Sequence, residues 1–121
     1  MKKKKLSITI GITAFNEGKL LVDAWDSVLN QTTNDWEAVI VLDGGGDEKT
    51  RKYFDSIQHP RLKKYYFTQN QKTYPCRKKA IELTETDWYF HLDAEDLLTP
   101  NEIELVTNKI WAKQRYQFGY K

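Results

Sequence analysis

The acidic segment Asp93-Ala94-Glu95-Asp96 has the residue types and spacing best suited to chemistry. In an extended segment, residues two positions apart point the same way, so Asp93 and Glu95 are expected to share one face. Neighbouring carboxylates repel each other unless a cation lies between them, and hard oxygen ligands suit Mg²⁺ or Mn²⁺. Mg²⁺ commonly takes one or two carboxylates and completes its coordination with phosphate and water. The spacing is equally compatible with an acidic turn that caps a helix.

Three further groups of polar residues follow apolar runs that are typical of strands. In chain order they comprise Thr13, Ala14, Phe15, Asn16 and Glu17; Asp43 with Gly44, Gly45 and Gly46; and Asn70 and Lys72, with Arg77 and Lys78 in the helix that follows. Each group alone is typical of an ordinary polar loop. Together with the acidic segment they bring aromatic, acidic and basic side chains to the ends of successive strands, which indicates a binding site.

The elements that must position these groups alternate between strand and helix. Runs rich in β-branched and aromatic residues predict strands, and apolar residues three or four apart predict helices. The predicted strands cover 7–13, 36–42, 62–67 and 87–92, and the predicted helices cover 19–30, 47–57, 75–84 and a last stretch from about 100. This order implies an α/β fold with right-handed crossovers and a mostly parallel sheet covered by helices on both faces. Such a sheet binds its ligand at the carboxyl ends of its strands.

Length, charge and cysteine content restrict the function. The 121 residues suffice for one domain, 1–121, and the net charge of +2 argues against a nucleic-acid partner. Residues 1–6 form a basic tail, expected to be solvated, although it could also be attracted weakly to an anionic membrane surface. Cys76 is the only cysteine and is expected to be a small packed residue. No apolar stretch approaches the ~20 residues that span a bilayer, so we expect a cytoplasmic protein, with any membrane contact peripheral at the inner face.

The roles of His91 and of the glycines after the second strand are not determined by their spacing. The sequence also lacks the motifs of several other α/β protein classes. His91 is expected to face the core from its strand. The three glycines after the second strand either let a ligand approach the backbone or form a flexible turn. The sequence has no G-x-G-x-x-G after its first strand and no G-x-x-x-x-G-K-[ST]. A receiver domain would place paired acids, and a nucleotidyltransferase a Gly-rich basic loop, where this chain has Phe15-Asn16-Glu17.

Five segments together resemble family 2 glycosyltransferases, which have a Rossmann-like GT-A fold. Residues 8–17 are similar to that family's first strand and P-T-Y-N, 27–32 to S-[IV]-L-x-Q-T, 36–45 to aromatic-E-x-x-V-x-D-D-G-S, 70–78 to N-x-G-x-x-x-A-R-N, and 92–96 to L-D-x-D-D. The similarity runs in order from about residue 7 to residue 112. Among the departures, Glu95 stands for the second Asp of D-x-D, Lys72 for a glycine and Leu42 for the first Asp of D-D.

The resemblance implies a role for each matching residue. Nucleotide-sugar contacts are implied for Thr13, Phe15, Glu17, Asp43, Arg77 and Asp93, and a site for Mn²⁺ or Mg²⁺ at Asp93 and Glu95. Thr13 and Phe15 would hold the nucleobase, and Asp43 would accept the uracil ring N–H, which favours a UDP-sugar donor. Asp93 and Glu95 would contact the ribose and a metal ion that bridges the diphosphate.

The implied reaction is an inverting transfer of a sugar to a glycan, lipid-linked or protein acceptor. In that family the acceptor-binding half carries the general base, so these 121 residues are expected to be a truncated domain with the catalytic base unknown. The alternative is a non-catalytic module that binds a nucleotide or a protein. Because surface that the acceptor-binding half would cover is exposed, self-association is also expected.

Overall fold

The computed structural model describes residues 8–117, with side chains as far as residue 113. Strands and helices alternate throughout: β1 (Ile8–Ala14), α1 (Lys19–Leu29), β2 (Glu37–Leu42), α2 (Glu48–Ser56), β3 (Leu62–Tyr66), α3 (Thr73–Glu82), β4 (Trp88–Asp93) and α4 (Glu102–Gln117). The predicted order of elements is therefore confirmed. The basic tail of residues 1–6, and with it the membrane contact, lies outside the described residues.

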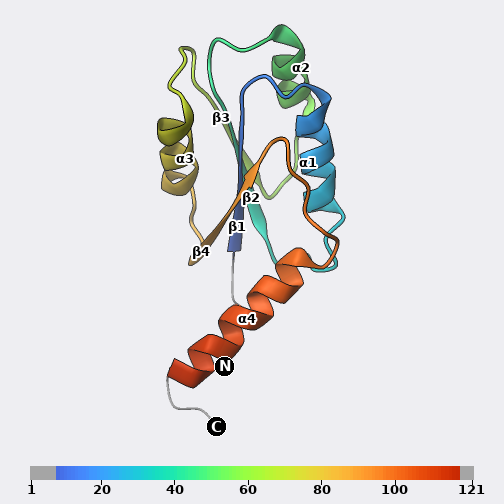
Figure 1. Ribbon diagram of the computed structural model, residues 1–121, viewed down its shortest axis with the longest axis vertical. Coiled ribbons are helices and arrows are strands. Elements are labelled where there is room, and N and C mark those ends of the chain that lie inside the picture. Colours follow the sequence, from blue (N-terminus) through green and yellow to red (C-terminus); the bar gives the residue numbers. More distant parts are fainter. Residues whose placement is uncertain (1–7, 118–121) are drawn as a thin grey trace.

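The strands form one parallel sheet in the order β3-β2-β1-β4. Helices α1 and α2 cover one face of this sheet and α3 covers the other (Figure 1). β1 and β2 are buried along nearly their whole length, as expected of central parallel strands with helices on both sides. The predicted α/β architecture, with helices on both faces, is thus confirmed.

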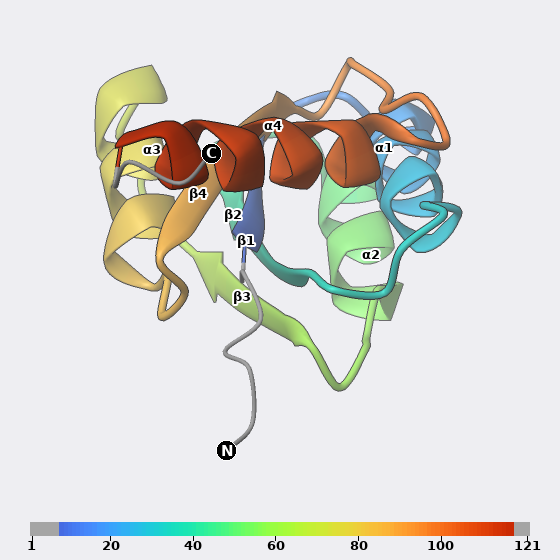
Figure 2. The same ribbon diagram turned by 90° about the horizontal axis from the view of Figure 1, so that it is seen from below.

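Helix α4 lies apart from the other helices, at the amino ends of the strands (Figure 1). Seen from below, it crosses beneath the sheet from the side of α1 towards the side of α3 (Figure 2). Of its side chains up to residue 113, those that join the main core lie in its first turns: the fully buried Ile103 and the neighbouring Val106. Of the helices in residues 8–117, none combines the length and apolar character that crossing a membrane requires.

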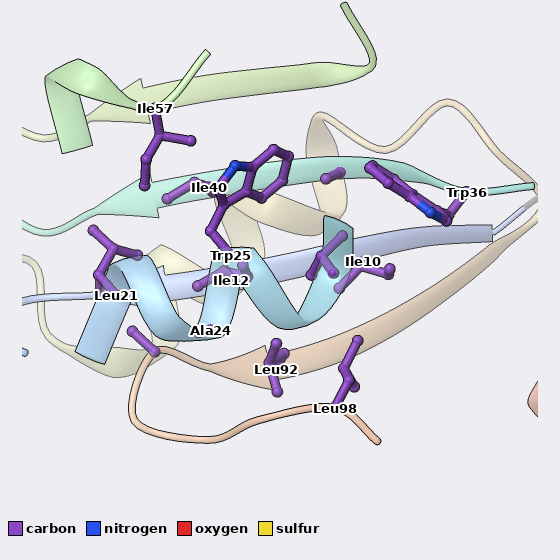
Figure 3. Close-up of a cluster of buried hydrophobic side chains, with 14 of the residues drawn as sticks. Ile10, Ile12, Leu21, Ala24, Trp25, Trp36, Ile40, Ile57, Leu92 and Leu98 are labelled. Carbon is purple, nitrogen blue, oxygen red and sulfur yellow. The ribbon is translucent and has the colours of Figure 1, made fainter. Parts of the chain in front are cut away.

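The main core lies between the sheet and helices α1 and α2. One stripe of α1 (Leu21, Ala24, Trp25 and Val28) is buried because these positions recur every three or four residues. In Figure 3 three of these side chains lie against apolar side chains from β1, β2 and β4. Each fully buried aliphatic side chain stabilises the fold by about 1.5–3 kcal/mol relative to exposure.

A smaller core lies beneath α3 on the opposite face. It joins Val39 and Val41 of β2 to Cys76 and Ala80 of α3, and the ring of Tyr89 packs against it. Cys76 is 3% exposed, which confirms the prediction of a small packed residue. Burial, with a smaller contribution from nearby Asp43, raises the pKa of the Cys76 thiol to about 12.

A clamp formed by Ser27 and Gln31 fixes the connection between β4 and α4. Leu98 N–H donates to Ser27 Oγ (3.1 Å), and Ile103 N–H donates to Gln31 Oε1 (2.9 Å). The Gln31 amide also donates to the Thr99 carbonyl (2.7 Å), and Gln31 is only 7% exposed. The S-x-x-x-Q segment is therefore structural: it holds the chain that follows the acidic segment against the end of α1.

Candidate functional site

A cavity of about 570 Å³ opens at the carboxyl ends of the strands. All seven residues singled out from the sequence line it: Thr13, Phe15, Glu17, Asp43, Arg77, Asp93 and Glu95. The wall also includes Ala14, Asn70, Lys72, Thr73, Cys76 and Ala94. The fold thus brings residues that are up to 82 positions apart (95 − 13) into one place, where a parallel sheet is expected to bind its ligand.

The ladders of the sheet set the spacing of these groups. Thr13 of β1 lies opposite Asp93 of β4 in one ladder, and opposite Val41 of β2 in the other. Beyond the strand ends, Asp43 N–H donates to the Ala14 carbonyl (2.9 Å) and Ala94 N–H donates to the Thr13 carbonyl (3.2 Å). β1 therefore carries the centre of the cavity, with one acidic group held on either side.

Asp43 is 6% exposed, and its carboxylate already accepts hydrogen bonds from neighbouring residues of the protein. Oδ1 accepts from the N–H groups of Gly44 (2.9 Å) and Gln71 (2.7 Å), and Oδ2 accepts from Lys72 N–H (2.9 Å) and Asn70 Nδ2 (3.1 Å). A carboxylate offers about four lone-pair sites, so these four hydrogen bonds use its capacity. The role predicted for Asp43, acceptance of the uracil N–H, requires that one of these donors be exchanged.

Lys72 has an unusual backbone conformation at the edge of the cavity. Its φ of 70° and ψ of −174° fall in a region that only glycine occupies readily. Such a conformation costs about 1–3 kcal/mol, and here the hydrogen bond from Lys72 N–H to Asp43 holds it in place. The helix α3 consequently begins at Thr73, before the predicted start at residue 75, and its amino end faces the cavity with Arg77.

The glycines after β2 let protein loops, not a ligand, approach the backbone. A Cβ at Gly44 would lie 2.5 Å from the Phe67 carbonyl oxygen, and one at Gly46 would lie 2.5 Å from the Phe15 carbonyl oxygen. Gly44 therefore packs against the β3–α3 loop and Gly46 against the β1–α1 loop. Neither reading of the sequence, a ligand contact or a plain flexible turn, describes these two positions.

Glu17 shapes the loop that carries Phe15. Its Oε1 accepts a hydrogen bond from Phe15 N–H (2.5 Å), which turns the chain back on itself before α1. The next residue, Gly18, donates its N–H to Thr50 Oγ1 of α2 (2.9 Å). The half-buried Phe15 ring is thereby placed on the wall of the cavity, where it can stack against a flat ligand.

The acidic segment is a turn, so the expectation of an extended backbone is wrong. β4 continues to Asp93, and a hydrogen bond from Asp96 N–H to the Asp93 carbonyl (2.9 Å) closes a turn over Ala94 and Glu95. Nor does the segment cap a helix, because α4 begins only at Glu102. Asp93 and Glu95 still line the same cavity, since the buried Ala94 turns the chain between them.

The carboxylates of Asp93 and Glu95 could supply part of the coordination of a metal ion, with a bound ligand supplying the rest. Within residues 8–117, no group of three or more His, Cys, Asp or Glu side chains is placed to hold an ion. Asp93 and Glu95 offer two carboxylates at the cavity, which is the number Mg²⁺ commonly takes when phosphate and water supply the rest. The donor set therefore fits Mg²⁺ or Mn²⁺ bound together with a phosphorylated ligand.

His91 faces the interior on the α3 side of the sheet, as expected, but polar groups rather than apolar ones contact its ring nitrogens. Its side chain is 16% exposed and lies on the α3 side of the sheet, with Nε2 2.9 Å from Asp93 Oδ1 and Nδ1 2.9 Å from the Tyr89 hydroxyl. Arg77 Nη2 lies 4.0 Å from the same Asp93 oxygen. Burial, the largest influence, raises the pKa of Tyr89 to about 12, so its hydroxyl remains a donor at neutral pH.

The sequence contains a signal for this arrangement. Residues 89, 91 and 93 alternate along one strand, and alternate residues point to the same face of a sheet. Tyr89 and His91 therefore had to lie in a row behind Asp93 once the strand was assigned.

Comparison with known proteins relates the chain to transferases of sugars. Residues 9–116 match the family described as Glycosyl transferase family 2. Chondroitin synthase from Escherichia coli is 31% identical over 99 residues, covering 81% of this chain and 14% of the synthase. The chain thus spans a small part of the length of that relative.

Solved structures share the fold at lower identity. S. aureus TarS (residues 1–349) in complex with UDP has a TM-score of 0.74 and 18% identity, over 88% of this chain and 32% of TarS. The mannosyltransferase PcManGT from Pyrobaculum calidifontis, in complex with GDP-Man and Mn²⁺, has a TM-score of 0.69 and 18% identity, over 89% of this chain and 32% of PcManGT. The four-stranded parallel sheet and its helices correspond to the amino-terminal part of GT-A transferases.

Proposed function

Because this chain belongs to glycosyltransferase family 2, we propose that its cavity binds the nucleotide of a sugar donor, with a UDP-sugar preferred. One observation carries this proposal: the seven residues that the family resemblance assigns to the donor all line one 570 Å³ cavity. The volume lies within the range of about 300–1,000 Å³ that is typical of small-molecule sites. TarS and PcManGT, which share the fold, were solved in complex with UDP and with GDP-Man and Mn²⁺, and this supports a nucleotide as the ligand.

Different residues of the cavity are placed to contact different parts of the donor. Thr13 and the Phe15 ring are placed to hold the base, while Arg77 and the amino end of α3 are placed to attract the diphosphate. Asp43 can receive a uracil N–H if Asn70, the most distant of these four donors, gives up its place. The long arm and exposed position of Glu95 suit the outer part of the site, near the diphosphate.

Asp93 and Glu95 would hold a divalent ion, Mn²⁺ or Mg²⁺, against the diphosphate. When bound, such an ion stabilises negative charge on the departing nucleotide, as a Lewis acid does. The acceptor hydroxyl would displace the nucleotide at the anomeric carbon in one inverting step. The base that takes the hydroxyl proton, the acceptor, and turnover by this chain belong to the proposal for the whole protein, since the chain spans 14% and 32% of the relatives above.

Calorimetric titration of UDP, with Mn²⁺ or with EDTA, tests the donor site. We expect binding with Mn²⁺ that weakens at least about tenfold, or about 1.4 kcal/mol, in EDTA. Glu95→Gln should reproduce that loss in Mn²⁺ and change nothing in EDTA. Glu48→Gln is the matched control, because Glu48 is an exposed carboxylate on α2 outside the cavity.

Each contrary outcome removes a defined part of the proposal. UDP binding that is equal in Mn²⁺ and EDTA would exclude the metal site at Asp93 and Glu95. GDP binding as tightly as UDP would exclude the preference for uracil. No binding of either nucleotide would exclude the donor site and favour the alternative, a non-catalytic module that binds another protein.

A further inference from the structure

Three polar side chains stand in a row along β4, on the face that α3 covers. Tyr89, His91 and Asp93 alternate with residues that face the opposite side, and hydrogen-bond distances of 2.9 Å join the first to the second and the second to the third. The row ends in the cavity, because Asp93 lines it. The row therefore connects a site residue to the packed interior beneath α3.

The chemistry of the groups sets the direction of both hydrogen bonds. An ionised carboxylate only accepts, so His91 Nε2 must carry the hydrogen that is donated to Asp93. In a neutral imidazole the other nitrogen is then an acceptor, so the Tyr89 hydroxyl donates to Nδ1. Asp93 thus selects the tautomer of His91, and the Tyr89 hydroxyl supports it by donating to the ring nitrogen that carries no hydrogen.

A glycine in the middle of β1 makes room for this row. Gly11 lies opposite His91 in the β1–β4 ladder, and a Cβ at Gly11 would overlap the hydroxyl end of the Tyr89 ring. A glycine inside a strand is otherwise unfavourable, and it often marks a close approach of another group. The close approach here is that of the phenol that holds His91.

The row also determines which oxygen of Asp93 remains for a ligand. His91 Nε2 and Arg77 Nη2 both approach Oδ1, at 2.9 Å and 4.0 Å. Among the described residues, Oδ2 of Asp93 has neither a hydrogen-bond nor an ion-pair partner. The carboxylate is thereby held by one oxygen with the other available to the cavity.

We propose that His91, held by Tyr89, is a positioning residue that fixes the Asp93 carboxylate so that Oδ2 receives the donor nucleotide or its metal ion. The proposal rests on the donor site proposed above. Partners behind a ligating group generally contribute about 10–100-fold to metal affinity, because they fix the orientation of that group. His91 would act through Asp93 and need not touch the donor itself.

The imidazole nitrogens of the ligand-free chain give the first test. In a long-range ¹H–¹⁵N spectrum at mildly alkaline pH we expect His91 in the Nε2–H form. Tyr89→Phe and Asp93→Ala should each shift this signal or broaden it into a tautomer mixture. His59 is the internal reference, since its Nδ1 accepts from Arg61 N–H (3.1 Å) far from β4 and should not respond.

Nucleotide binding in four variants gives the second test. His91→Leu should weaken binding of UDP with Mn²⁺ by about tenfold, the lower end of the range for such partners. His91→Gln should restore most of the loss, because its amide N–H can donate to Asp93 as the imidazole does. In the Asp93→Ala background His91→Leu should have no further effect, since residues that act through one another are not additive.

The outcomes separate this proposal from the one it rests on. A His91 ring in the Nδ1–H form, equal losses from His91→Leu with and without Asp93, or failure of His91→Gln to restore binding would each overturn the positioning role. If the parent chain binds no UDP, the donor site fails, and the ring spectrum alone decides whether Tyr89 and His91 fix Asp93. In that case a His91 signal that ignores Tyr89→Phe and Asp93→Ala overturns the arrangement itself.

Discussion

At the scale of single residues, Asp43 determines the shape of one wall of the cavity. Its two oxygens accept four hydrogen bonds, three of them from backbone N–H groups of Gly44, Gln71 and Lys72. These bonds close the β3–α3 loop and hold Lys72 in its strained conformation. The proposed recognition of the base and the structure of the loop therefore depend on the same carboxylate, and removal of Asp43 cannot report on base recognition alone.

Asp43→Ala should lower the free energy of unfolding by about 2 kcal/mol or more, because several N–H donors lose a buried acceptor. Denaturant titration measures this loss. Glu95→Ala is the matched control: Glu95 is exposed and accepts no hydrogen bond from the described residues, so it should change stability by less than about 0.5 kcal/mol. Equal stability of the two variants would contradict the structural role of Asp43.

The raised pKa of Cys76 predicts a loss of stability in alkali. An unfolded thiol loses its proton above about pH 9, whereas the folded thiol keeps its proton until about pH 12, so between these values the native state binds more protons. Stability contributed by Cys76 is therefore complete below pH 9 and falls as the pH rises towards 12. Comparison of the parent with Cys76→Ala by denaturant titration across this range isolates the thiol, and parallel pH profiles would contradict the prediction.

At the scale of the elements, the Ser27–Gln31 clamp links α1 to the segment between β4 and α4. Gln31→Ala should destabilise the protein by about 2–3 kcal/mol, because Ile103 N–H and the Thr99 carbonyl lose a partner that is 7% exposed. Gln58→Ala, at an exposed position after α2, is the control and should be nearly neutral. Thermal unfolding of both variants tests the clamp, which would be refuted by equal midpoints.

Local sequence patterns predicted the order of strands and helices, but they could not predict contacts between segments that are distant in the sequence. The stripe on α1 and the apolar run of β2 carry their own periodicity, so both elements could be recognised directly. The start of α3 could not be recognised in this way, because the positive φ of Lys72 is held by a hydrogen bond to Asp43, 29 residues earlier. Helix propensity depends on the local sequence, so it does not reflect such a tertiary hydrogen bond.

The site was predictable to the level of which residues meet, but not of how they interact. Parallel strands bring their carboxyl ends to one edge, which sufficed to gather Thr13, Asp43 and Asp93. The partners of Asp93 depend on the register of β1 with β4, which places Gly11 opposite His91.

At the scale of the whole molecule, large apolar side chains remain at the surface. They include Leu20 and Leu29 on α1, Tyr74 and Ile81 on α3, Leu97 before α4, and Leu105 on α4, each more than 40% exposed. We therefore expect self-association, seen as a rise of mass with concentration in light scattering. Association through apolar surface should persist in high salt, whereas association through charged lysine side chains should be lost because salt screens their charge. A monomer at high concentration in both conditions would contradict the expectation.

The position of β1 between β2 and β4 has a consequence for the order in which the cavity is built. Residues 8–66 contain three adjacent strands and Asp43, so one wall can assemble while the rest of the chain is still being synthesised. The other wall waits for β4, whose pairing of Ile8 with Trp88 spans 80 positions, and contacts between such distant residues form slowly. If the proposed donor site binds a nucleotide, it can do so only after β4 has docked against β1. Such binding would stabilise the docked strand by mass action, so the availability of the ligand would govern how long β4 stays paired with β1.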